Sequence, residues 1–263
     1  MTLALERVEI ERGGRTLLRD VTLALDGGVV AVIGPNGVGK TTLLRTMAGV
    51  LAPAAGTVRL DGTSVRALDP RERARRIALV EPTEPVLAAL SVGDAVASAR
   101  FPYHRWWEWE ATAADELAVD GALARAGLAT FRSREIGTLS AGERQRVWIA
   151  LAIAQHASVV LLDEPTSHLD LRASVETLQL VRELAAAGAL VVCVLHQLEE
   201  AAAFADRVVV LGDGGVVADD RPEVAITTAT IERAYGVTLS VEHRPEGLAF
   251  HRNLMPSRTS TSS

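Results

Sequence analysis

The sequence predicts an α/β fold: a mainly parallel sheet with an inserted α-helical subdomain. Two observations predict it. Short apolar runs, typical of strands covered on both faces, alternate with segments of helical spacing near both ends of the chain. From Ser91 to about Ile136 the sequence becomes rich in alanine and poor in β-branched residues. Strand–helix alternation on both sides of a helical insert indicates a parallel sheet with a separate helical subdomain.

Strands and turns are expected in the first third of the chain. Residues 3–10 alternate between apolar and polar side chains, whereas Val29 to Ile33 form a continuous apolar run. Asp26-Gly27-Gly28 marks a turn between them, and Lys40 to Ala48 carries helical spacing. Two further short strands are expected: residues 57–60, which form a hairpin with Asp61-Gly62, and residues 77–80.

The second half returns to alternating strands and helices. Ser91 followed by Asp94 resembles a capping box at the start of the helical insert, and a long helix is expected after Ser140. The strands expected are residues 159–162, 190–195 and 208–211, the last being the final strand, with a helix over 171–186 and a short helix before the final strand. The predicted division is a core with its β subdomain over 1–90 and 155–245, a helical subdomain over 91–154, and a tail over 246–263 with a disordered end at 256–263.

Length and composition exclude several classes of protein. The chain has 263 residues, 48% of them apolar and 23% charged, which excludes disordered, collagen-like and coiled-coil proteins. Its 27 basic and 33 acidic residues give a net charge of −6, which argues against nucleic acid as the main partner. A single cysteine, Cys193, excludes an internal disulfide and favours a reducing compartment. The apolar run 184–195 is shorter than the about 20 residues that span a bilayer, so no transmembrane helix or secretory signal is expected.

The strongest motif is Gly34-Pro35-Asn36-Gly37-Val38-Gly39-Lys40-Thr41, which fits the pattern G-x-x-x-x-G-K-[ST]. It follows an apolar strand and begins a helix. Glycines let successive backbone N–H groups point inward, and the helix N-terminus adds the positive end of its dipole, so this loop is expected to bind phosphates. Lys40 would reach the β- and γ-phosphates, and Thr41 and Thr42 would help to hold a Mg²⁺-bound nucleotide, with the Thr41 hydroxyl on the metal.

Acidic side chains follow a second apolar strand. Residues 159–162 lead directly into Asp163-Glu164. A carboxylate at the end of a neighbouring buried strand can hold Mg²⁺, which is the role expected of Asp163, and the next carboxylate, Glu164, can orient or deprotonate the attacking water. Such residues also cap helices or face solvent; their combination with the phosphate loop favours the catalytic interpretation.

Two further motifs make the pattern specific. Leu139-Ser140-Ala141-Gly142-Glu143-Arg144-Gln145-Arg146 resembles the L-S-G-G-Q signature of ABC-transporter ATP-binding subunits. Residues 165–170 resemble the turn with the D-loop of that family, and His196 matches its switch histidine. The resemblance extends from about Leu3 to Glu242. It implies a P-loop NTPase (RecA-like) core with an N-terminal antiparallel β subdomain and an inserted α-helical subdomain. Such a core binds ATP and Mg²⁺ and hydrolyses ATP.

In that family ATP lies between two cassettes, so the resemblance also implies a dimer. The stretch from Ser140 to Glu143 would face the γ-phosphate bound by the partner cassette, and Asp170 would lie at the dimer junction. Both Ser140 and Asp170 can equally be helix N-caps, and His196 can be a structural histidine. The catalytic groups that the resemblance implies are Lys40, Glu164 and His196.

Three positions depart from the family pattern. Arg12 stands before the Gly13-Gly14 turn, where the family usually has an aromatic residue that stacks on adenine, and a guanidinium can also stack on a purine. The glutamine expected after residues 77–80 is absent: Pro82 aligns with it, and the neighbouring Glu81 could ligate the metal. In the signature, Ala141 requires a negative φ, and Glu143 must point away from phosphates or be neutralised, with Arg144 or Arg146 as candidates.

An aromatic cluster bears on the partner. The stretch Arg100-Phe101-Pro102-Tyr103-His104-Arg105-Trp106-Trp107-Glu108-Trp109 holds three of the four tryptophans of the chain. It can pack locally within the helical subdomain or dock against a cytoplasmic helix of a membrane permease. Together with residues 146–155, the start of this stretch resembles the branch that energises import of iron-siderophore, haem or cobalamin complexes.

The resemblance therefore implies an ATP-hydrolysing subunit of an ABC importer, expected on the cytoplasmic face of the membrane. The implied partners are permease subunits, a second cassette and an extracytoplasmic substrate-binding protein, and no nucleic acid. The alternative is a regulatory or weakly hydrolysing ABC subunit of another transporter type, including an exporter, which Arg12 and Glu81-Pro82 motivate. A soluble ABC protein of DNA repair or translation is disfavoured by the acidic net charge and the single cassette.

Overall fold

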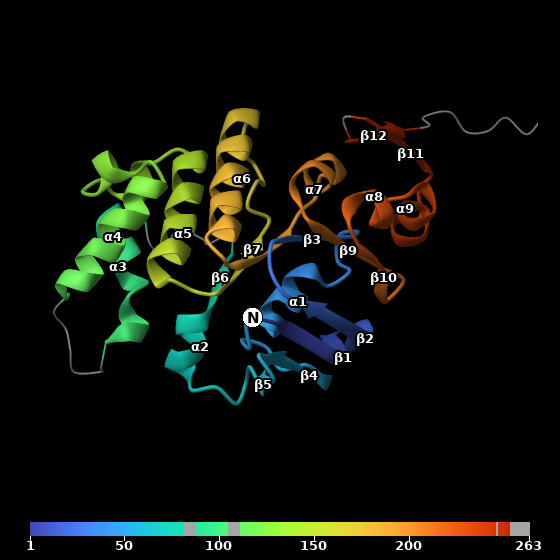
Figure 1. Cartoon of the computed structure of the whole chain (residues 1–263), viewed down its shortest axis with the longest axis horizontal. Coiled ribbons are helices and arrows are strands. Elements are labelled where there is room, and N and C mark those ends of the chain that lie inside the picture. Colours follow the sequence, from blue (N-terminus) through green and yellow to red (C-terminus); the bar gives the residue numbers. More distant parts are fainter. Residues whose placement is uncertain (82–87, 105–110, 246, 253–263) are drawn as a thin grey trace, which may run out of the picture.

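The computed structural model describes residues 1–81, 88–104, 111–245 and 247–252. Figure 1 shows an N-terminal antiparallel sheet beside a larger central sheet, with α3 and α4 at one end of the molecule and α8 and α9 at the other. This is the α/β architecture that the sequence predicts, with a separate β part and an inserted helical part.

The central sheet has the strand order β10-β9-β3-β8-β7-β6, and only the β10–β9 pair is antiparallel. Nearly every side chain of β3, β7, β8 and β9 is buried, as expected of parallel strands covered on both faces. Because β3, β8 and β7 are adjacent and parallel, the loops at their carboxyl ends meet at one edge. The bounds are β3 Val29–Ile33, β6 Ile77–Val80, β7 Val159–Asp163, β8 Leu190–Val194, β9 Arg207–Gly212 and β10 Gly215–Asp220.

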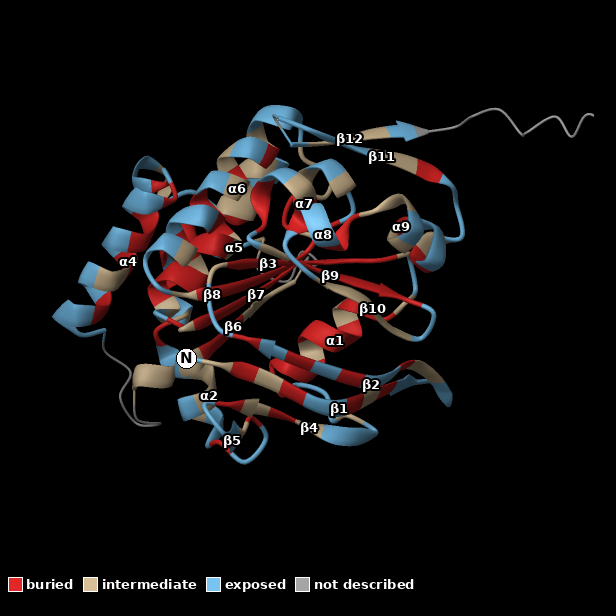
Figure 2. Ribbon diagram, turned by 45° about the vertical axis from the view of Figure 1, so that its right-hand side comes forward, coloured by how far each residue is buried: buried red, intermediate tan, exposed pale blue. Residues whose placement is uncertain are grey.

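The N-terminal sheet has the order β2-β1-β4-β5 and is antiparallel throughout. Helix α1 lies between this sheet and the central one, and its Leu43, Leu44 and Met47 are fully buried (Figure 2). The start of α1 is therefore fixed by packing on two sides. Gly56, at φ +79°, cannot carry a side chain because a Cβ would lie 2.2 Å from the Arg7 carbonyl oxygen. The bounds are β1 Leu3–Arg12, β2 Arg15–Leu25, β4 Ala55–Leu60, β5 Thr63–Ser64 and α1 Lys40–Met47.

The other face of the central sheet is covered by helices. Apolar side chains of α5 and α6 pack on that face, and α3 and α4 pack in turn on α5. Ser91 caps α3 by accepting a hydrogen bond from the Asp94 N–H at 3.1 Å, which is one half of the capping box that the sequence predicts. The Asp94 carboxylate accepts from the Ser91 hydroxyl at 2.6 Å. The bounds are α2 Pro70–Arg76, α3 Val92–Ser98, α4 Ala113–Arg125, α5 Ala141–Gln155, α6 Leu171–Ala186 and α7 Leu198–Phe204, with 3₁₀ turns η2 Phe101–Tyr103, η3 Ala129–Phe131 and η4 Ile136–Thr138.

The expectation that residues 208–211 form the final strand is wrong. Three strands and two helices follow them. In β10 the side chains are half-buried or exposed, and β11 and β12 pair in a largely exposed hairpin, so none of them shows the apolar run that marks a buried strand. The bounds are α8 Pro222–Ala225, α9 Thr228–Tyr235, β11 Leu239–Arg244 and β12 Gly247–Arg252.

Two expectations about single features can be compared directly with the structure. Across the described residues, no helix is both long and apolar enough to cross a membrane. Cys193 lies within β8 with no exposed surface, and burial raises the pKa of its thiol, so it packs as a small apolar residue. The tryptophans at 106, 107 and 109, Pro82 and the tail at 256–263 lie outside the described residues.

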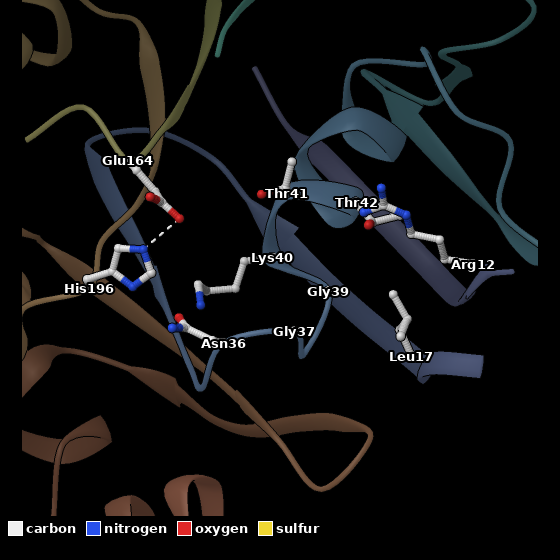
Figure 3. A pocket seen from close by; sticks show the side chains of 10 residues that line it. All are labelled: Arg12, Leu17, Asn36, Gly37, Gly39, Lys40, Thr41, Thr42, Glu164 and His196. Carbon is white, nitrogen blue, oxygen red and sulfur yellow. Dashed lines mark ion pairs between the residues drawn. The ribbon is translucent and has the colours of Figure 1, made fainter. Parts of the chain in front are cut away.

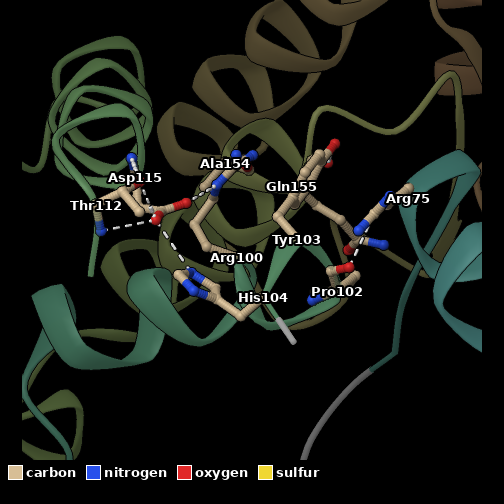
Figure 4. Close-up of polar contacts among 9 residues, drawn as sticks. All are labelled: Arg75, Arg100, Pro102, Tyr103, His104, Thr112, Asp115, Ala154 and Gln155. Atoms are coloured by element: carbon tan, nitrogen blue, oxygen red, sulfur yellow. Dashed lines mark hydrogen bonds and ion pairs between the residues drawn. The ribbon is translucent and has the colours of Figure 1, made fainter. Parts of the chain in front are cut away.

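A buried charged cluster joins the start of α4 to residues 100–104 (Figure 4). Asp115 Oδ1 lies 2.9 Å from Arg100 Nε, and Asp115 Oδ2 lies 3.0 Å from His104 Nε2 and accepts a hydrogen bond from the Thr112 N–H at 2.9 Å. Burial acts to raise the pKa of the Asp115 carboxyl, but the hydrogen bonds from Thr112 and Arg100 outweigh it and lower the pKa to about 2.

We expect Asp115→Ala to lower the free energy of unfolding by about 3–5 kcal/mol, because it leaves the Arg100 guanidinium buried without its charge partner. The pKa of Asp115 is lower in the folded than in the unfolded chain, so its contribution is complete above about pH 4 and is lost as the pH falls towards 2. Urea unfolding at several pH values measures it. A stability difference between the two proteins that stays constant down to about pH 2 would contradict this role.

Candidate functional site

The predicted phosphate loop lies at the same edge of the central sheet as Asp163, Glu164 and His196. Residues 34–39 follow β3, Asp163 ends β7 and Glu164 follows it, and His196 lies just after β8. Since β8 lies between β3 and β7, His196 is placed between the loop and the two carboxylates. The strand order therefore brings together residues that are far apart in the sequence, at the edge where α/β proteins bind ligands.

The loop has the backbone that its glycines predict. Gly34, Gly37 and Gly39 have φ values of +156°, +79° and +111°, and Gly39 is the N-cap of α1. At Gly34 a Cβ would also lie 2.5 Å from the Leu211 carbonyl oxygen on β9. These positions exclude side chains, so the loop can present backbone N–H groups at the start of α1.

The Lys40 side chain folds onto the loop and contacts its backbone. Its Nζ donates to the carbonyl oxygens of Gly34 at 2.8 Å and Pro35 at 3.1 Å, and the residue is buried. Burial lowers the pKa of Lys40, while the nearby Glu164 and Asp163 carboxylates act to raise it. The ammonium thus lies beside the inner surface of the loop with acidic groups close by.

A pocket of about 520 Å³ opens over the loop (Figure 3). Arg12 from β1 and Leu17 from β2 lie at one end of the pocket. Glu164 and His196 lie at the other end. The sequence does not predict Leu17 as a site residue, because only the pairing of β1 with β2 brings it to the loop. A Cβ added to Gly39 would lie 3.3 Å from the Leu17 Cβ. The lining residues are Arg12, Leu17, Asn36, Gly37, Gly39, Lys40, Thr41, Thr42, Glu164 and His196.

The residues around Asp163 fit a magnesium ion. Asp163 is 7% exposed, and its Oδ1 is buried without a hydrogen-bond partner. Burial raises the pKa of this carboxyl, and a hydrogen bond from Thr41 acts to lower it. An unsatisfied carboxylate oxygen next to a threonine hydroxyl offers two oxygen ligands. No group of three His, Cys, Asp or Glu side chains in the described part of the chain could hold a metal alone, so an ion here would complete its shell with phosphate and water oxygens.

Glu164 and His196 contact each other at one end of the pocket. His196 Nε2 lies 2.6 Å from Glu164 Oε1, the only ion pair drawn in Figure 3. Glu164 has φ +50°, a left-handed conformation that is uncommon for a side chain with a Cβ and that occurs often at functional sites. The contact brings a carboxylate, which can act as a base, and an imidazole, which can donate a hydrogen bond, to the same end of the pocket.

Glu81 lies outside the pocket lining. Its Oε1 lies 2.6 Å from Arg45 Nε on α1, and its charge is among those that raise the pKa of Asp163. In this conformation the carboxylate is engaged with Arg45 beside the Asp163 carboxylate. Gly34, Pro35 and Val38 belong to the loop but do not line the pocket either.

The signature stretch begins helix α5. Ser140 caps it: its Oγ accepts from the Glu143 N–H at 3.3 Å, and the Glu143 carboxylate accepts from the Ser140 N–H at 2.7 Å. The Ser140 hydrogen bonds are the main cause that lowers the pKa of Glu143. The departure at Glu143 is therefore accommodated by a reciprocal capping box, with Arg134 and Arg146 as minor contributors. Ala141 is not among the non-glycine residues that have a positive φ, so its backbone meets the requirement for a negative φ.

The starts of α5 and α6 touch each other. A Cβ at Gly142 would lie 2.8 Å from the Ala173 Cβ, so glycine permits this close approach. Asp170 caps α6 by accepting from the Ala173 N–H at 2.8 Å. The two helix starts enclose a shallow pocket of about 240 Å³ that is separate from the phosphate loop. Its lining includes Ser140, Gly142, Glu143 and Asp170, but not Ala141.

We expect Ser140→Ala to lower the free energy of unfolding by about 1 kcal/mol, because α5 loses its cap. The matched variant Glu143→Gln should change it much less, since glutamine can take the same place in a capping box. Thermal unfolding of both variants measures the difference. Equal stability losses in the two variants would show that the cap does not depend on the Ser140 hydroxyl.

The phosphate loop follows β3, His196 follows the neighbouring strand β8, and Asp163 ends the next strand, β7. This arrangement defines the chain as a P-loop nucleotide-binding protein. The model of the ABC transporter family matches residues 18–167, which is more than half of the chain. The chain belongs to this family, whose ATP-binding subunits are ATPases.

The relatives agree with the branch that the sequence suggests. The chain is 40% identical over 262 residues to the cobalamin import ATP-binding protein BtuD of Halobacterium salinarum, covering 99% of this chain and 65% of that protein, so it spans less than two thirds of that relative. It is 36% identical over 246 residues to the ferric enterobactin transport ATP-binding protein FepC of Escherichia coli, covering 91% and 89%. A solved metal-chelate type ABC transporter in an inward-facing conformation matches with a TM-score of 0.80 at 26% identity, covering 95% and 96%.

Proposed function

We propose that the chain binds ATP with Mg²⁺ and hydrolyses it. The observation that carries this proposal is the meeting of Lys40, Asp163, Glu164 and His196 at the phosphate loop. Lys40 would leave the loop carbonyls for the β- and γ-phosphates, and Thr41, Thr42 and Asp163 would hold the Mg²⁺-bound nucleotide. The metal, when bound, would neutralise charge that develops on the phosphates.

Glu164 would act as the general base. Its carboxylate accepts the proton of the attacking water, and His196, now 2.6 Å away, would turn to donate to the γ-phosphate. Arg12 would stack on the base of the nucleotide and Leu17 would pack against it. Glu81, held by Arg45 beside Asp163, stays a proposed secondary metal ligand.

The second half of this site would come from another cassette. Ser140, Gly142 and the start of α5 offer a helix N-terminus to the γ-phosphate of a partner copy, with Ala141 and Glu143 shaping the same turn and Asp170 at the junction. Support comes from the pocket at the α5 and α6 starts, which lies apart from the phosphate loop of its own chain.

We infer that this ATPase energises import of a metal chelate, the class to which iron-siderophore, haem and cobalamin complexes belong. The support is the similarity to the cobalamin import and ferric enterobactin transport proteins. A membrane permease would hold two cassettes at the cytoplasmic face, an extracytoplasmic binding protein would deliver the complex, and no nucleic acid would take part. The chain would then be peripheral to the membrane, where the permease supplies the spanning helices.

Phosphate release by the purified chain, alone and with its co-purified permease, tests the catalytic part. Turnover that depends on Mg²⁺ and rises with permease supports an importer ATPase. ATP binding without turnover in both preparations would instead favour the regulatory or weakly hydrolysing subunit, which the Arg12 and Glu81 positions motivate. Uptake of labelled ferric chelates and corrinoids by cells that carry or lack the gene tests the substrate class.

A further inference from the structure

The C-terminal end of the signature helix is held by side chains from a distant segment (Figure 4). Arg100 Nη1 donates to the Ala154 carbonyl oxygen at 2.8 Å, and the Tyr103 hydroxyl donates to the Gln155 carbonyl oxygen at 2.9 Å. The last carbonyl groups of a helix lack partners within it, and a cation there also complements the helix dipole. Residues 100–103 therefore act as the C-terminal cap of α5.

This cap is itself rigid. The Arg100 guanidinium is fixed by the buried Asp115 carboxylate at 2.9 Å and lies over the Tyr103 ring, with its Cζ 3.7 Å from the ring centre. Arg75 Nε on α2 donates to the Pro102 carbonyl oxygen at 2.8 Å. The segment that caps α5 is thus tied both to α4 and to α2.

The last residue of α5 also reaches into the core. Gln155 Nε2 donates to the carbonyl oxygens of Ala74 and, at 3.0 Å, of Ile77, where α2 ends and β6 begins. Strand β6 then leads to Glu81 and its ion pair with Arg45 on α1. One end of α5 is consequently anchored to the sheet that carries the nucleotide pocket, and Ser140 stands at the other end.

We propose that Arg100, Tyr103 and Gln155 are positioning residues for ATP hydrolysis, because they fix the direction of α5 and with it the place of Ser140. A helix of 15 residues is about 22 Å long, so a tilt of about 5° at its anchored end moves its start by about 2 Å. Displacements of that size at a reacting group can lower a rate by about 10²-fold. The inference rests on the proposed function, in which Ser140 faces the nucleotide of a partner cassette.

The test uses two mild variants, Tyr103→Phe and Gln155→Met, and their combination, in the full chain. Neither leaves a buried charge unpaired, so both are expected to fold. Each removes hydrogen-bond donors from the α5 anchor, and we expect kcat to fall about threefold to tenfold in each and further in the combination. ATP affinity of the isolated chain should stay at the parent value, since Lys40 and the loop are untouched.

The matched control is Arg132→Gln in the same helical part of the chain. The Arg132 side chain pairs with Glu116 and Asp120 on the exposed side of α4 and makes no ion pair with α5. It should leave kcat unchanged. If the two anchor variants lower only the melting temperature and keep the parent kcat at 25 °C, the anchor is merely structural and the inference is overturned.

The result also separates this inference from the function on which it rests. If the parent chain shows no ATP turnover with or without permease, both the proposed function and the positioning role of the anchor are wrong. If the parent turns over ATP and the anchor variants have the same kcat, only the positioning role of the anchor is wrong. Reduced kcat with unchanged ATP affinity, and with weaker ATP-driven dimerisation, supports both.

Discussion

Replacing Glu164 with glutamine is expected to reduce ATP turnover by about 10²–10⁴-fold while leaving ATP binding close to that of the parent. The carboxylate of Glu164 faces His196 in the pocket and lies outside the set of groups that hold the phosphates. Glutamine keeps the size and the hydrogen-bonding oxygen of the side chain but cannot accept the proton of the attacking water. Binding energy therefore remains and the chemical step is lost.

Two measurements separate these effects. Phosphate release under saturating ATP gives the rate, and fluorescence titration with a nucleotide analogue gives the affinity. Because the bound ATP persists, the Glu164→Gln chain should also form an ATP-dependent dimer that gel filtration detects. An exposed carboxylate on α6 serves as the control: Glu183→Gln should keep the parent rate. Turnover of Glu164→Gln within a factor of about two of the parent would assign the base to another group.

The parts of the site that follow from local rules could be predicted from the sequence. A glycine-rich turn between a buried strand and a helix has one common conformation, and Gly34, Gly37 and Gly39 adopt the positive φ values that this conformation needs. Apolar runs marked β3, β7 and β8, because strands buried on both faces leave that signal in the sequence. Asp163, Glu164 and His196 could therefore be placed at the ends of specific strands.

Other features depend on contacts that sequence spacing does not contain. Leu17 reaches the nucleotide pocket only because β2 pairs with β1 beside α1. The C-terminal strands β10 to β12 are partly exposed and lack an apolar run, so the sequence pattern does not predict them. Gly142 is explained by the closeness of Ala173, a residue 31 positions later whose helix start packs against α5.

The signature illustrates how a family pattern can obscure a local rule. By family comparison Glu143 is a departure that must either point away from the phosphates or be neutralised, with Arg144 or Arg146 as candidates. By helix chemistry Ser140 and Glu143 are the two ends of a capping box, S-x-x-E, and the structure has both hydrogen bonds. Arg144 instead donates to the Leu139 carbonyl oxygen, and Arg146 pairs with Glu176 on α6 at 3.0 Å. The capping box is therefore the main reason why the substitution is accommodated, and the charges of Arg134 and Arg146 add little.

The second large effect is expected from Lys40→Met, which should weaken ATP binding by about 10²–10⁴-fold. Two charge-assisted hydrogen bonds to phosphate oxygens, each contributing about 1.5–3 kcal/mol, would be lost. Methionine keeps the buried aliphatic stem of Lys40, so the packing at the start of α1 should survive. Isothermal titration with ATP and Mg²⁺ measures the affinity, and thermal unfolding checks the fold.

The direction of this effect follows from where the ammonium now lies. In the structure Lys40 donates to the carbonyl oxygens of Gly34 and Pro35, and it has Asp163 and Glu164 as acidic neighbours. Removing it leaves the triphosphate facing those carboxylates with no cation of the loop between them, so repulsion adds to the lost hydrogen bonds. The exposed Arg66, changed to Met, controls for the loss of one positive charge and should bind ATP as the parent does. Parent-like affinity in Lys40→Met would mean that the phosphates bind elsewhere, and the assignments of Thr41, Asp163 and Glu164 would fall with that of Lys40.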